Sequence, residues 1–349
     1  MSRLTEKDAL SLLQNADLRE LGTLAYAQKK RLHPKNITTF VVDRNINYTN
    51  ICVAGCKFCA FKRGVNDEDG YLLDFGTIGT KIEELLDIGG TQILFQGGVH
   101  PKLTIEYYEE LVGYIHTKYP QITIHGFSAA EIAHIAKLSE ITIKETLIRL
   151  KQKGLSSIPG AGAEILSDRV RNIISPSKQN TAGWLEVHES AHNEGIKSTA
   201  TMMFGSVESD EEIIEHLEHI RMLQDKTGGF RAFIAWSFQP DNTPLKKEIP
   251  TAQKASPNRY LRILALSRLY LDNVKNIQSS WVTQGSHIGQ TALFFGANDM
   301  GSTMMEENVV AAAGAANKMA EDEIIRLIKD AGEIPAKRNT AYEILKVYE

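Results

Sequence analysis

Residues 38–61 read TTFVVDRNINYTNICVAGCKFCAF, a β-rich run followed by a loop that contains all three cysteines of the chain. Cys52, Cys56 and Cys59 are spaced C-x3-C-x2-C, and no other cysteine is present to complete a disulfide framework. A structural zinc site commonly has four ligands, and the only imidazole close in sequence belongs to His100. Three thiolates without a fourth favour an iron-sulfur cube with one iron open to another ligand. A zinc site and buried cysteines without a ligand are the alternatives.

The rest of the chain alternates between β-rich and amphipathic segments. We predict eight strands, the last from a weak signal, at 38–43, 91–95, 122–125, 156–159, 198–203, 231–236, 277–282 and 294–297. Intervening segments such as TIEYYEELVGYIHTKY place apolar residues three and four apart, as crossover helices do. Eight such units favour an α/β fold, a closed (β/α)8 barrel of the TIM type, over an open doubly wound sheet. An open or partial barrel is the alternative.

No linker or low-complexity tract interrupts residues 38–300. We therefore predict one barrel domain over 38–300, with a helical extension over 1–37. A second helical segment, 301–349, is expected to pack on the barrel. Residues 246–258 are the most loop-like part of the chain and are expected to lie between the sixth strand and its helix.

The composition is that of a soluble globular protein, with 42% hydrophobic and 23% charged residues among 349. Lys and Arg number 39 against 43 acidic residues, so the net charge is -4 and nucleic acid is a poor candidate partner. The N-terminal residues lack an apolar signal region, and no apolar run approaches the roughly 18 residues of a membrane span. We expect a cytoplasmic protein without a membrane partner.

Functional groups in such a barrel gather where the strands end. The predicted strand ends carry glycines and polar side chains more regularly than unrelated loops do. The residues singled out on this ground are Gln96, Gly97, Gly98, His125, Glu164, Gln239, Thr283, Gln284, Asn298 and Asp299.

The cysteine loop resembles that of the radical S-adenosylmethionine (SAM) superfamily, in which C-x3-C-x2-C follows the first strand and an aromatic residue such as Phe58 precedes the last cysteine. The resemblance implies that Cys52, Cys56 and Cys59 bind a [4Fe-4S] cluster whose open iron is chelated by SAM. It also implies that the backbone of Gln96, Gly97 and Gly98 contacts the methionine amino group, and that Glu164 and Arg169 contact the ribose and carboxylate of SAM. A structural turn, an exposed glutamate and a surface arginine are the alternatives for these positions.

Nearly the whole chain resembles one branch of this superfamily, which contains aminofutalosine synthases, deazaflavin (FO) synthase subunits and dehypoxanthine futalosine cyclases. The segments WSFQPDNTPL (236–245) and SWVTQG (280–285) resemble the cyclases most. Ala235 stands where a proline is expected, and Ser206 stands where the branch often has histidine or another polar residue. The resemblance implies substrate contacts from Trp236, Gln239, Thr283, Gln284 and Asn298. Lys57, Lys62 or Arg63 would meet a benzoate carboxylate.

For a cyclase, the resemblance implies that a 5′-deoxyadenosyl radical removes hydrogen from the ribose C4′ of dehypoxanthine futalosine. The carbon radical then attacks the benzoate ring, and loss of an electron and a proton gives cyclic dehypoxanthine futalosine, a step toward menaquinone. His125 and Asp299 are candidate acceptors of that proton because both follow predicted strands; a structural histidine and a capping aspartate are the alternatives. A low-potential donor such as flavodoxin or ferredoxin would supply electrons. Aminofutalosine synthase, FO synthase and a non-catalytic iron-sulfur sensor or electron carrier are the rival functions.

Overall fold

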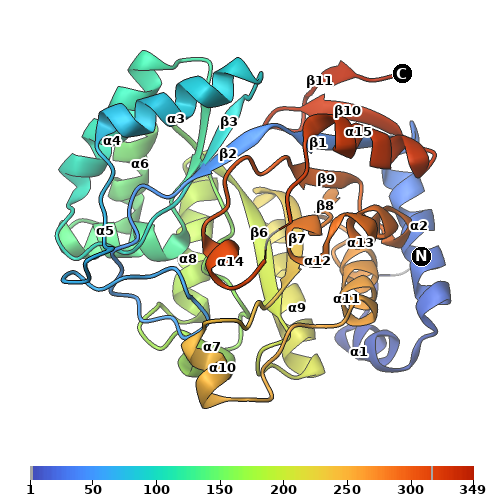
Figure 1. Cartoon of the computed structure of the whole chain (residues 1–349). Helices are drawn as coiled ribbons and strands as arrows, with labels where there is room; N and C mark the ends of the chain where they lie inside the picture. The colour runs from blue at the N-terminus through green and yellow to red at the C-terminus, as the bar shows by residue number, and fades with distance from the viewer. Residues whose placement is uncertain (1–2, 316) are drawn as a thin grey trace.

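The computed structural model describes residues 3–315 and 317–349. Its strands form one curled sheet in the order β11-β10-β1-β9-β8-β7-β6-β5-β4-β3-β2 (Figure 1). Their bounds are β1 (Ile37–Val41), β2 (Asp43–Ile46), β3 (Gln92–Phe95), β4 (Thr123–Gly126), β5 (Leu155–Ile158), β6 (Lys197–Phe204), β7 (Phe230–Ser237), β8 (Asn276–Gln278), β9 (Asp299–Ser302), β10 (Ile334–Arg338) and β11 (Ile344–Val347).

The strands β1 and β2 are two halves of one bent strand, separated only by Val42. β1 pairs with β9, with Thr39 opposite Asp299, whereas β2 pairs with β3. The bend therefore brings the two sides of the sheet together, and the strands from β1/β2 to β9 run parallel around a barrel. The α/β barrel of the TIM type is confirmed, although β8 and β9 are joined by the single pair Gln278 and Asp299.

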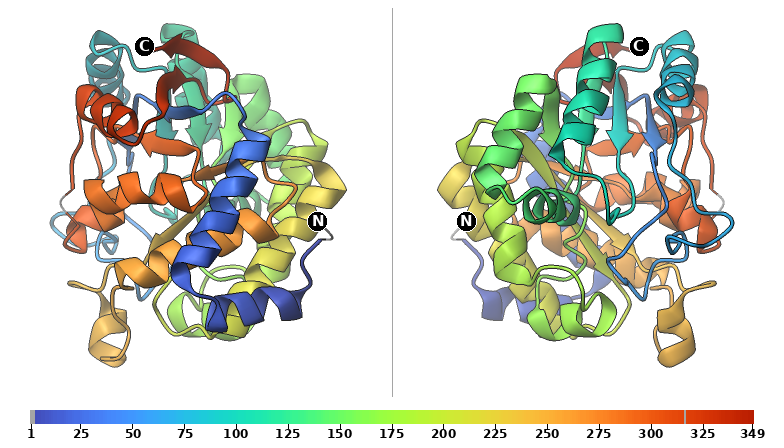
Figure 2. Two further views of the ribbon diagram at one scale, coloured as in Figure 1. Left: turned by 90° about the vertical axis from the view of Figure 1, so that its right-hand side faces the viewer. Right: turned by 90° about the vertical axis from the view of Figure 1, so that its left-hand side faces the viewer.

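Helices cover the outside of the curled sheet (Figures 1 and 2). Caps fix their ends: the Ser209 side chain accepts the N–H of Glu212 at the start of α9, and Gly228 ends that helix with φ +58°. The helices are α1 (Glu6–Asn15), α2 (Leu18–Leu32), α3 (Phe75–Asp87), α4 (Ile105–Lys118), α5 (Ala129–Leu138), α6 (Ile143–Lys153), α7 (Asp168–Ile174), α8 (Thr181–Asn193), α9 (Asp210–Thr227), α10 (Pro244–Glu248), α11 (Pro257–Tyr270), α12 (Trp281–Gln284), α13 (Ser286–Thr291), the 3-10 helix η1 (Ala292–Phe295), α14 (Val309–Ala312) and α15 (Glu321–Asp330).

The last two strands of the barrel differ from their predicted positions. The segment 294–297 is not a strand; its first two residues lie in η1, and the eighth barrel strand is β9. The seventh strand, β8, ends at Gln278, so that Trp281 begins the short helix α12. A run of four apolar residues has no periodicity that separates a strand from a buried helical turn, which explains the first error.

The prediction of a helical segment over 301–349 is wrong in part. α15 is helical, but β10 and β11 extend the sheet beyond β1. β10 pairs parallel with β1, with Ile37 opposite Ile334, and therefore covers an edge that β1 would otherwise expose.

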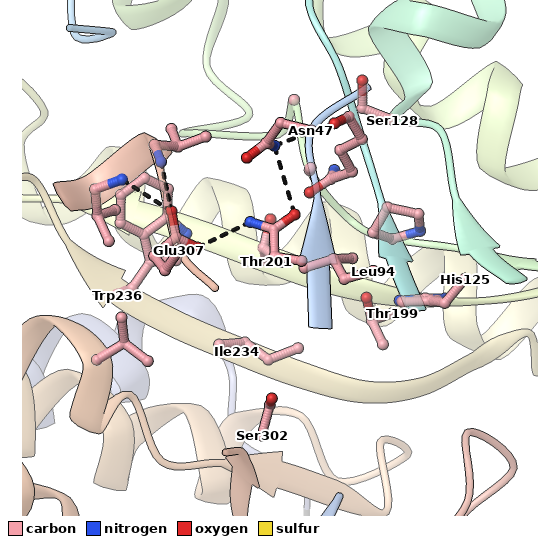
Figure 3. A pocket seen from close by; sticks show the side chains of 18 of the residues that line it. Asn47, Leu94, His125, Ser128, Thr199, Thr201, Ile234, Trp236, Ser302 and Glu307 are labelled. Carbon is pink, nitrogen blue, oxygen red and sulfur yellow. Dashed lines mark hydrogen bonds between the residues drawn. The ribbon is translucent and has the colours of Figure 1, made fainter. Parts of the chain in front are cut away.

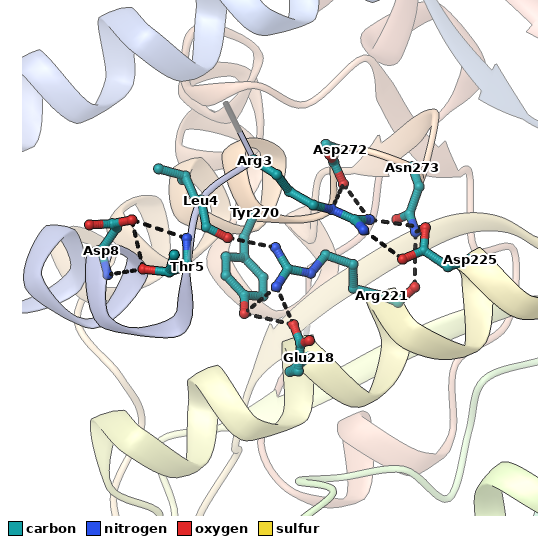
Figure 4. Close-up of polar contacts among 10 residues, drawn as sticks. All are labelled: Arg3, Leu4, Thr5, Asp8, Glu218, Arg221, Asp225, Tyr270, Asp272 and Asn273. Carbon is teal, nitrogen blue, oxygen red and sulfur yellow. Dashed lines mark hydrogen bonds and ion pairs between the residues drawn. The ribbon is translucent and has the colours of Figure 1, made fainter. Parts of the chain in front are cut away.

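Polar contacts fasten the segment that leads into α1 to the helices outside the sheet (Figure 4). The Arg3 guanidinium lies 2.6 Å from Asp225 at the end of α9 and 2.9 Å from Asp272, just after α11. Arg221 of α9 donates a 2.8 Å hydrogen bond to the Leu4 carbonyl. Within the described part of the chain, no helix combines the length and apolar character needed to cross a bilayer.

Candidate active site

A cavity of about 390 Å³ occupies the barrel interior and the loops at the carboxyl ends of its strands. Side chains from the strands line its depth, among them His125, Thr201, Ile234 and Trp236 (Figure 3). The cysteine loop lines its other end. One continuous space therefore connects the three cysteines with the inside of the barrel.

Cys52, Cys56 and Cys59 are free thiols that line this cavity. They pack among apolar side chains, including Ala54, Val99 and Phe58. Burial raises the pKa of Cys56 to about 11, while the nearby ammonium group of Lys178 opposes that shift. Among residues 3–315 and 317–349, no three Cys, His, Asp or Glu side chains are close enough to share one metal ion. In an iron-sulfur cube each thiolate binds a different iron, so the three sulfurs need not converge on one point.

The glycine pair after β3 lies directly against the start of the cysteine loop. A Cβ atom on Gly98 would lie 2.2 Å from the Ile51 carbonyl oxygen, and one on Gly97 would lie 2.5 Å from the Tyr48 ring. The Gly98 N–H donates to the Thr49 carbonyl at 2.8 Å. Only glycine permits this approach, and it leaves the Gln96–Gly98 backbone in the cavity wall.

Glu131 holds this turn in place and was missed in the sequence. Its carboxylate accepts hydrogen bonds from the Gly97 N–H at 2.9 Å and from the Tyr48 hydroxyl at 2.7 Å. It also forms a capping box with Ser128 at the start of α5. The pattern S-x-x-E at 128–131 is the signal that could have located it.

Glu164 faces the cavity on the other side of the cysteine loop. It has φ +43°, and its Oε1 atom lies 3.0 Å from the Lys178 ammonium group. Its Oε2 atom is buried and has no hydrogen-bond partner among the described residues, although the Arg171 guanidinium lies 3.8 Å away. Although burial lowers the pKa of Lys178, the neighbouring Cys56 and Glu164 raise it above its usual range. The unpartnered oxygen is an acceptor suited to a hydroxyl group.

Arg169 does not reach this cavity. Its guanidinium is half exposed and forms hydrogen bonds with the Glu212 carboxylate at 2.5 and 2.7 Å. It also donates to the Val207 carbonyl at 2.8 Å. The cations that accompany Glu164 are Lys178, 3.0 Å from Oε1, and Arg171, 3.8 Å from Oε2.

The structure brings only some of the predicted substrate residues to the cavity. Trp236 and Thr283 line it. Gln239 folds back on the Ser237 carbonyl at 2.8 Å, and Gln284 donates to the Ser237 hydroxyl at 2.6 Å. Asn298 accepts from the Arg268 guanidinium and from the Ile277 N–H, at 2.6 and 2.9 Å, and so joins strands rather than facing the cavity.

The two candidate proton acceptors have different surroundings. His125 lines the cavity, with Nδ1 2.7 Å from the Ser157 hydroxyl. Burial, with a smaller effect from Arg231 and Arg338, lowers the pKa of His125 to about 3. Asp299 is fully buried and outside the cavity lining, where it forms a two-pronged ion pair with Arg338 at 2.5 and 2.9 Å. This aspartate therefore fixes β9 to β10.

The three basic residues that were expected to contact a benzoate carboxylate also differ in position. Lys57 pairs with Glu248 at 2.6 Å, and Arg63 pairs with Asp69 at 2.5 Å. Only Lys62 lines the cavity.

Residues 46–220 match the model of the radical SAM superfamily, and residues 227–349 match that of the CofH/MqnC C-terminal region.

The chain belongs to the radical SAM superfamily.

Among its relatives, cyclic dehypoxanthine futalosine synthases of Streptomyces coelicolor and Halalkalibacterium halodurans are each 45% identical to it over 99% of the chain, covering 87% and 93% of their own lengths. Aminodeoxyfutalosine synthase of Thermus thermophilus is 38% identical over 99% of the chain and 94% of that protein. The crystal structure of methylornithine synthase superposes with a TM-score of 0.73 at 19% identity, covering 96% of this chain and 94% of that one.

The protein is thus a radical SAM enzyme, and its superfamily uses a [4Fe-4S] cluster and SAM. The residues present fit both groups. Three free thiols stand at one end of the cavity, and Glu164 Oε2 is a buried acceptor without a hydrogen-bond partner among the described residues, as a site for a ligand hydroxyl group would require. Gly97 and Gly98 line the cavity, so a molecule bound there lies next to their backbone atoms.

A large part of this radical SAM cavity comes from residues that sequence reasoning missed. Asn45 and Asn47 line it beside β2, and the chain after β9 closes it. These later residues are Ser302, Met304, Glu307, Val309, Val310, Arg338, Thr340 and Tyr342. No local motif identifies them in the sequence, because only tertiary packing brings them to the cavity; Thr340, for example, contacts Gln92 and Arg231 near the amino ends of β3 and β7.

Proposed function

We propose that this radical SAM enzyme converts dehypoxanthine futalosine into cyclic dehypoxanthine futalosine, in the futalosine route to menaquinone. The observation that carries the proposal is the single cavity that joins the cysteine loop to Trp236 inside the barrel. The two relatives at 45% identity that bear the name of this synthase support the choice of substrate.

When bound, the cluster and SAM supply the one-electron chemistry that removes hydrogen from the ribose C4′. Cys52, Cys56 and Cys59 hold the cluster. The backbone of Gly97 and Gly98 and the free Glu164 oxygen orient SAM, and Lys178 offers a cation to its carboxylate. These groups lie on one side of the cavity, so the substrate occupies the remaining space toward Trp236.

The substrate side of the cavity must exclude water and keep C4′ close to the benzoate ring. Leu94, Ile234 and Trp236 supply apolar surface, and Trp236 provides an aromatic face for the ring. Thr283 provides a hydroxyl for the sugar, and Lys62 at the cysteine loop provides a positive charge for the carboxylate.

The electron comes from a low-potential donor of the flavodoxin or ferredoxin type, and the enzyme works in the cytoplasm. Because the cysteine loop forms part of the cavity mouth, the donor approaches from that side. Direct reduction by either protein, in place of a chemical reductant, tests this part of the proposal.

Anaerobic reconstitution with iron and sulfide, followed by SAM, reductant and dehypoxanthine futalosine, tests the main proposal. Mass spectrometry should find 5′-deoxyadenosine together with a product two hydrogens lighter than the substrate. 5′-Deoxyadenosine without that product would reject the substrate and favour those of aminofutalosine synthase or FO synthase. Neither signal, with the cluster formed, would favour a sensor or an electron carrier.

A further inference from the structure

The loop after β9 is fastened to β2 residue by residue. Arg44 donates to Glu306 at 2.7 Å, and Asn45 donates to Glu307 at 3.0 Å. Asn308 donates to Asn47 at 3.2 Å. Neighbouring residues of a strand point to opposite faces of the sheet, so Arg44 and Asn45 point in opposite directions. Their partners Glu306 and Glu307 therefore lie in different surroundings.

Glu306 is an outer, ion-paired residue. It lies 2.8 Å from the Lys81 ammonium group in addition to its contact with Arg44. Glu307 instead lines the same cavity as Thr201 and Trp236 (Figure 3). The charge of Glu306 is thus neutralised outside the barrel, whereas the Glu307 carboxylate faces the part of the cavity that we assign to the substrate.

The Glu307 carboxylate is held in one orientation. Its Oε1 atom accepts the N–H groups of Val309 and Val310 at 2.7 and 3.0 Å, and, among the described residues, Oε2 accepts only from Asn45. A carboxylate has about four acceptor sites, so one remains after these three bonds. Burial raises the pKa of Glu307, as does the charge of Asp43, while the three hydrogen bonds oppose the shift.

The other acids of the cavity, within the described residues, are engaged elsewhere. Asp43 accepts from Ser302 and from Gln92, the latter at 2.7 Å. Glu131 holds the glycine turn, and Glu164 lies beside Lys178 at the cysteine loop. His125 is a weak base there because its pKa is about 3.

We propose that Glu307 accepts the proton that leaves the benzoate ring after cyclisation, an inference that rests on the proposed function. Once the bond between C4′ and the ring carbon has formed, that ring carbon still carries hydrogen. Its C–H bond breaks, the proton passes to the Glu307 carboxylate, and one electron passes to an oxidised iron-sulfur centre. The ring regains its aromatic sextet, and the overall loss is one proton and one electron.

The test compares Glu307→Gln with its neighbour Glu306→Gln, using substrate that carries deuterium at C4′. Glutamine keeps an oxygen for Val309 and Val310 but is not a base. In Glu307→Gln, deuterium should still reach 5′-deoxyadenosine within about twofold of the wild-type rate. The yield of cyclic product per 5′-deoxyadenosine should fall on the order of a hundredfold, the usual effect of a lost general base. Glu306→Gln should change neither quantity more than about twofold, because Glu306 lies outside the cavity lining and Arg44 keeps its ion pair with Glu84.

Two further measurements separate proton transfer from a structural role. Lowering the pH should reduce the product yield per 5′-deoxyadenosine in the wild type and leave it flat in Glu307→Gln. The charged groups nearest this titration are Asp43 on β2 and Glu306 with its partners Arg44 and Lys81. Glu307→Asp should recover part of the yield.

An unchanged yield of cyclic product per 5′-deoxyadenosine in Glu307→Gln would overturn the proposal. Equal losses of deuterium transfer and of product in that variant would also overturn it. So would a product yield in Glu307→Asp as low as that in Glu307→Gln. Failure of the proposed function looks different, because wild-type enzyme would then transfer no deuterium at all. Thermal unfolding and iron content of each variant show whether the fold and cluster are intact.

Discussion

The two halves of the cavity are built in different ways. In the cofactor half, formed by the loops after β2 to β5, groups come from short motifs: the cysteine loop, the glycine pair and Glu164. In the substrate half, formed by β7 to β9 and residues 302–310, the wall comes from separate segments. Gln284 and Asn298, chosen there from the sequence, hold the framework together instead. A motif carries its own local geometry, whereas a residue at a strand end depends on register and on distant partners.

The largest effect is expected in the cofactor half. Cys56→Ala removes one of the three thiolates and should reduce iron-sulfur content and bring 5′-deoxyadenosine formation to background. Iron and sulfide analysis with the visible spectrum measures the first effect, and mass spectrometry measures the second. Full cluster content in this variant would break the assignment of the cysteine loop.

In the substrate half, Asp299→Asn should act on stability. Removing one partner of a buried ion pair leaves Arg338 uncompensated and costs about 3–5 kcal/mol of unfolding free energy. Urea unfolding measures this loss. Unchanged stability with lost cyclisation would instead restore Asp299 as a proton acceptor.

The pH dependence of the free energy of unfolding allows a buried histidine of the cavity wall to be compared with one of the surrounding core. His125 lines the cavity and His216 lies on α9 behind it, and burial lowers the pKa of each to about 3. Below pH 6.5 the unfolded chain binds protons that the folded chain does not, so stability falls as the pH is lowered. Each histidine should contribute about 2 kcal/mol to the loss at pH 5.

Urea unfolding at pH 7 and pH 5 measures this loss, and His125→Gln should remove its share. If His125→Gln loses as much unfolding free energy between pH 7 and pH 5 as the wild type, water reaches His125 in the cavity wall. His125 and His216 would then differ in how well they are shielded from water.

The smallest effect distinguishes Lys178, which lines the cofactor half, from Arg169, which lies outside the cavity. Lys178→Met should weaken SAM binding to the reconstituted enzyme about tenfold, or 1.4 kcal/mol. The matched change Arg169→Met should alter affinity less than about twofold, because Arg169 is held by Glu212 outside the cavity. Calorimetric titration with SAM measures both. The reverse order would return Arg169 to the site.

Much of the fold and the cofactor half could be predicted from sequence, for physical reasons. Strand-helix alternation reports on local burial, and Gly97 and Gly98 are required by close backbone contacts. The substrate half could not be predicted in the same way. Asp299 and Asp43 are both acids of the strand region, but only Asp43 faces the cavity. That difference depends on strand register and on Arg338, which lies 39 residues from Asp299 in sequence.

The bent strand β1/β2 also has a consequence for synthesis of the chain. Its second half finds β3 soon after the cysteine loop is made, whereas its first half pairs with β9 and β10, close to the C-terminus. On the ribosome, β1 therefore remains an unpaired edge until β9 has emerged. Closure of the barrel is a late, long-range event, and a chain that stops before β9 keeps its cysteine loop on a strand that is only half secured.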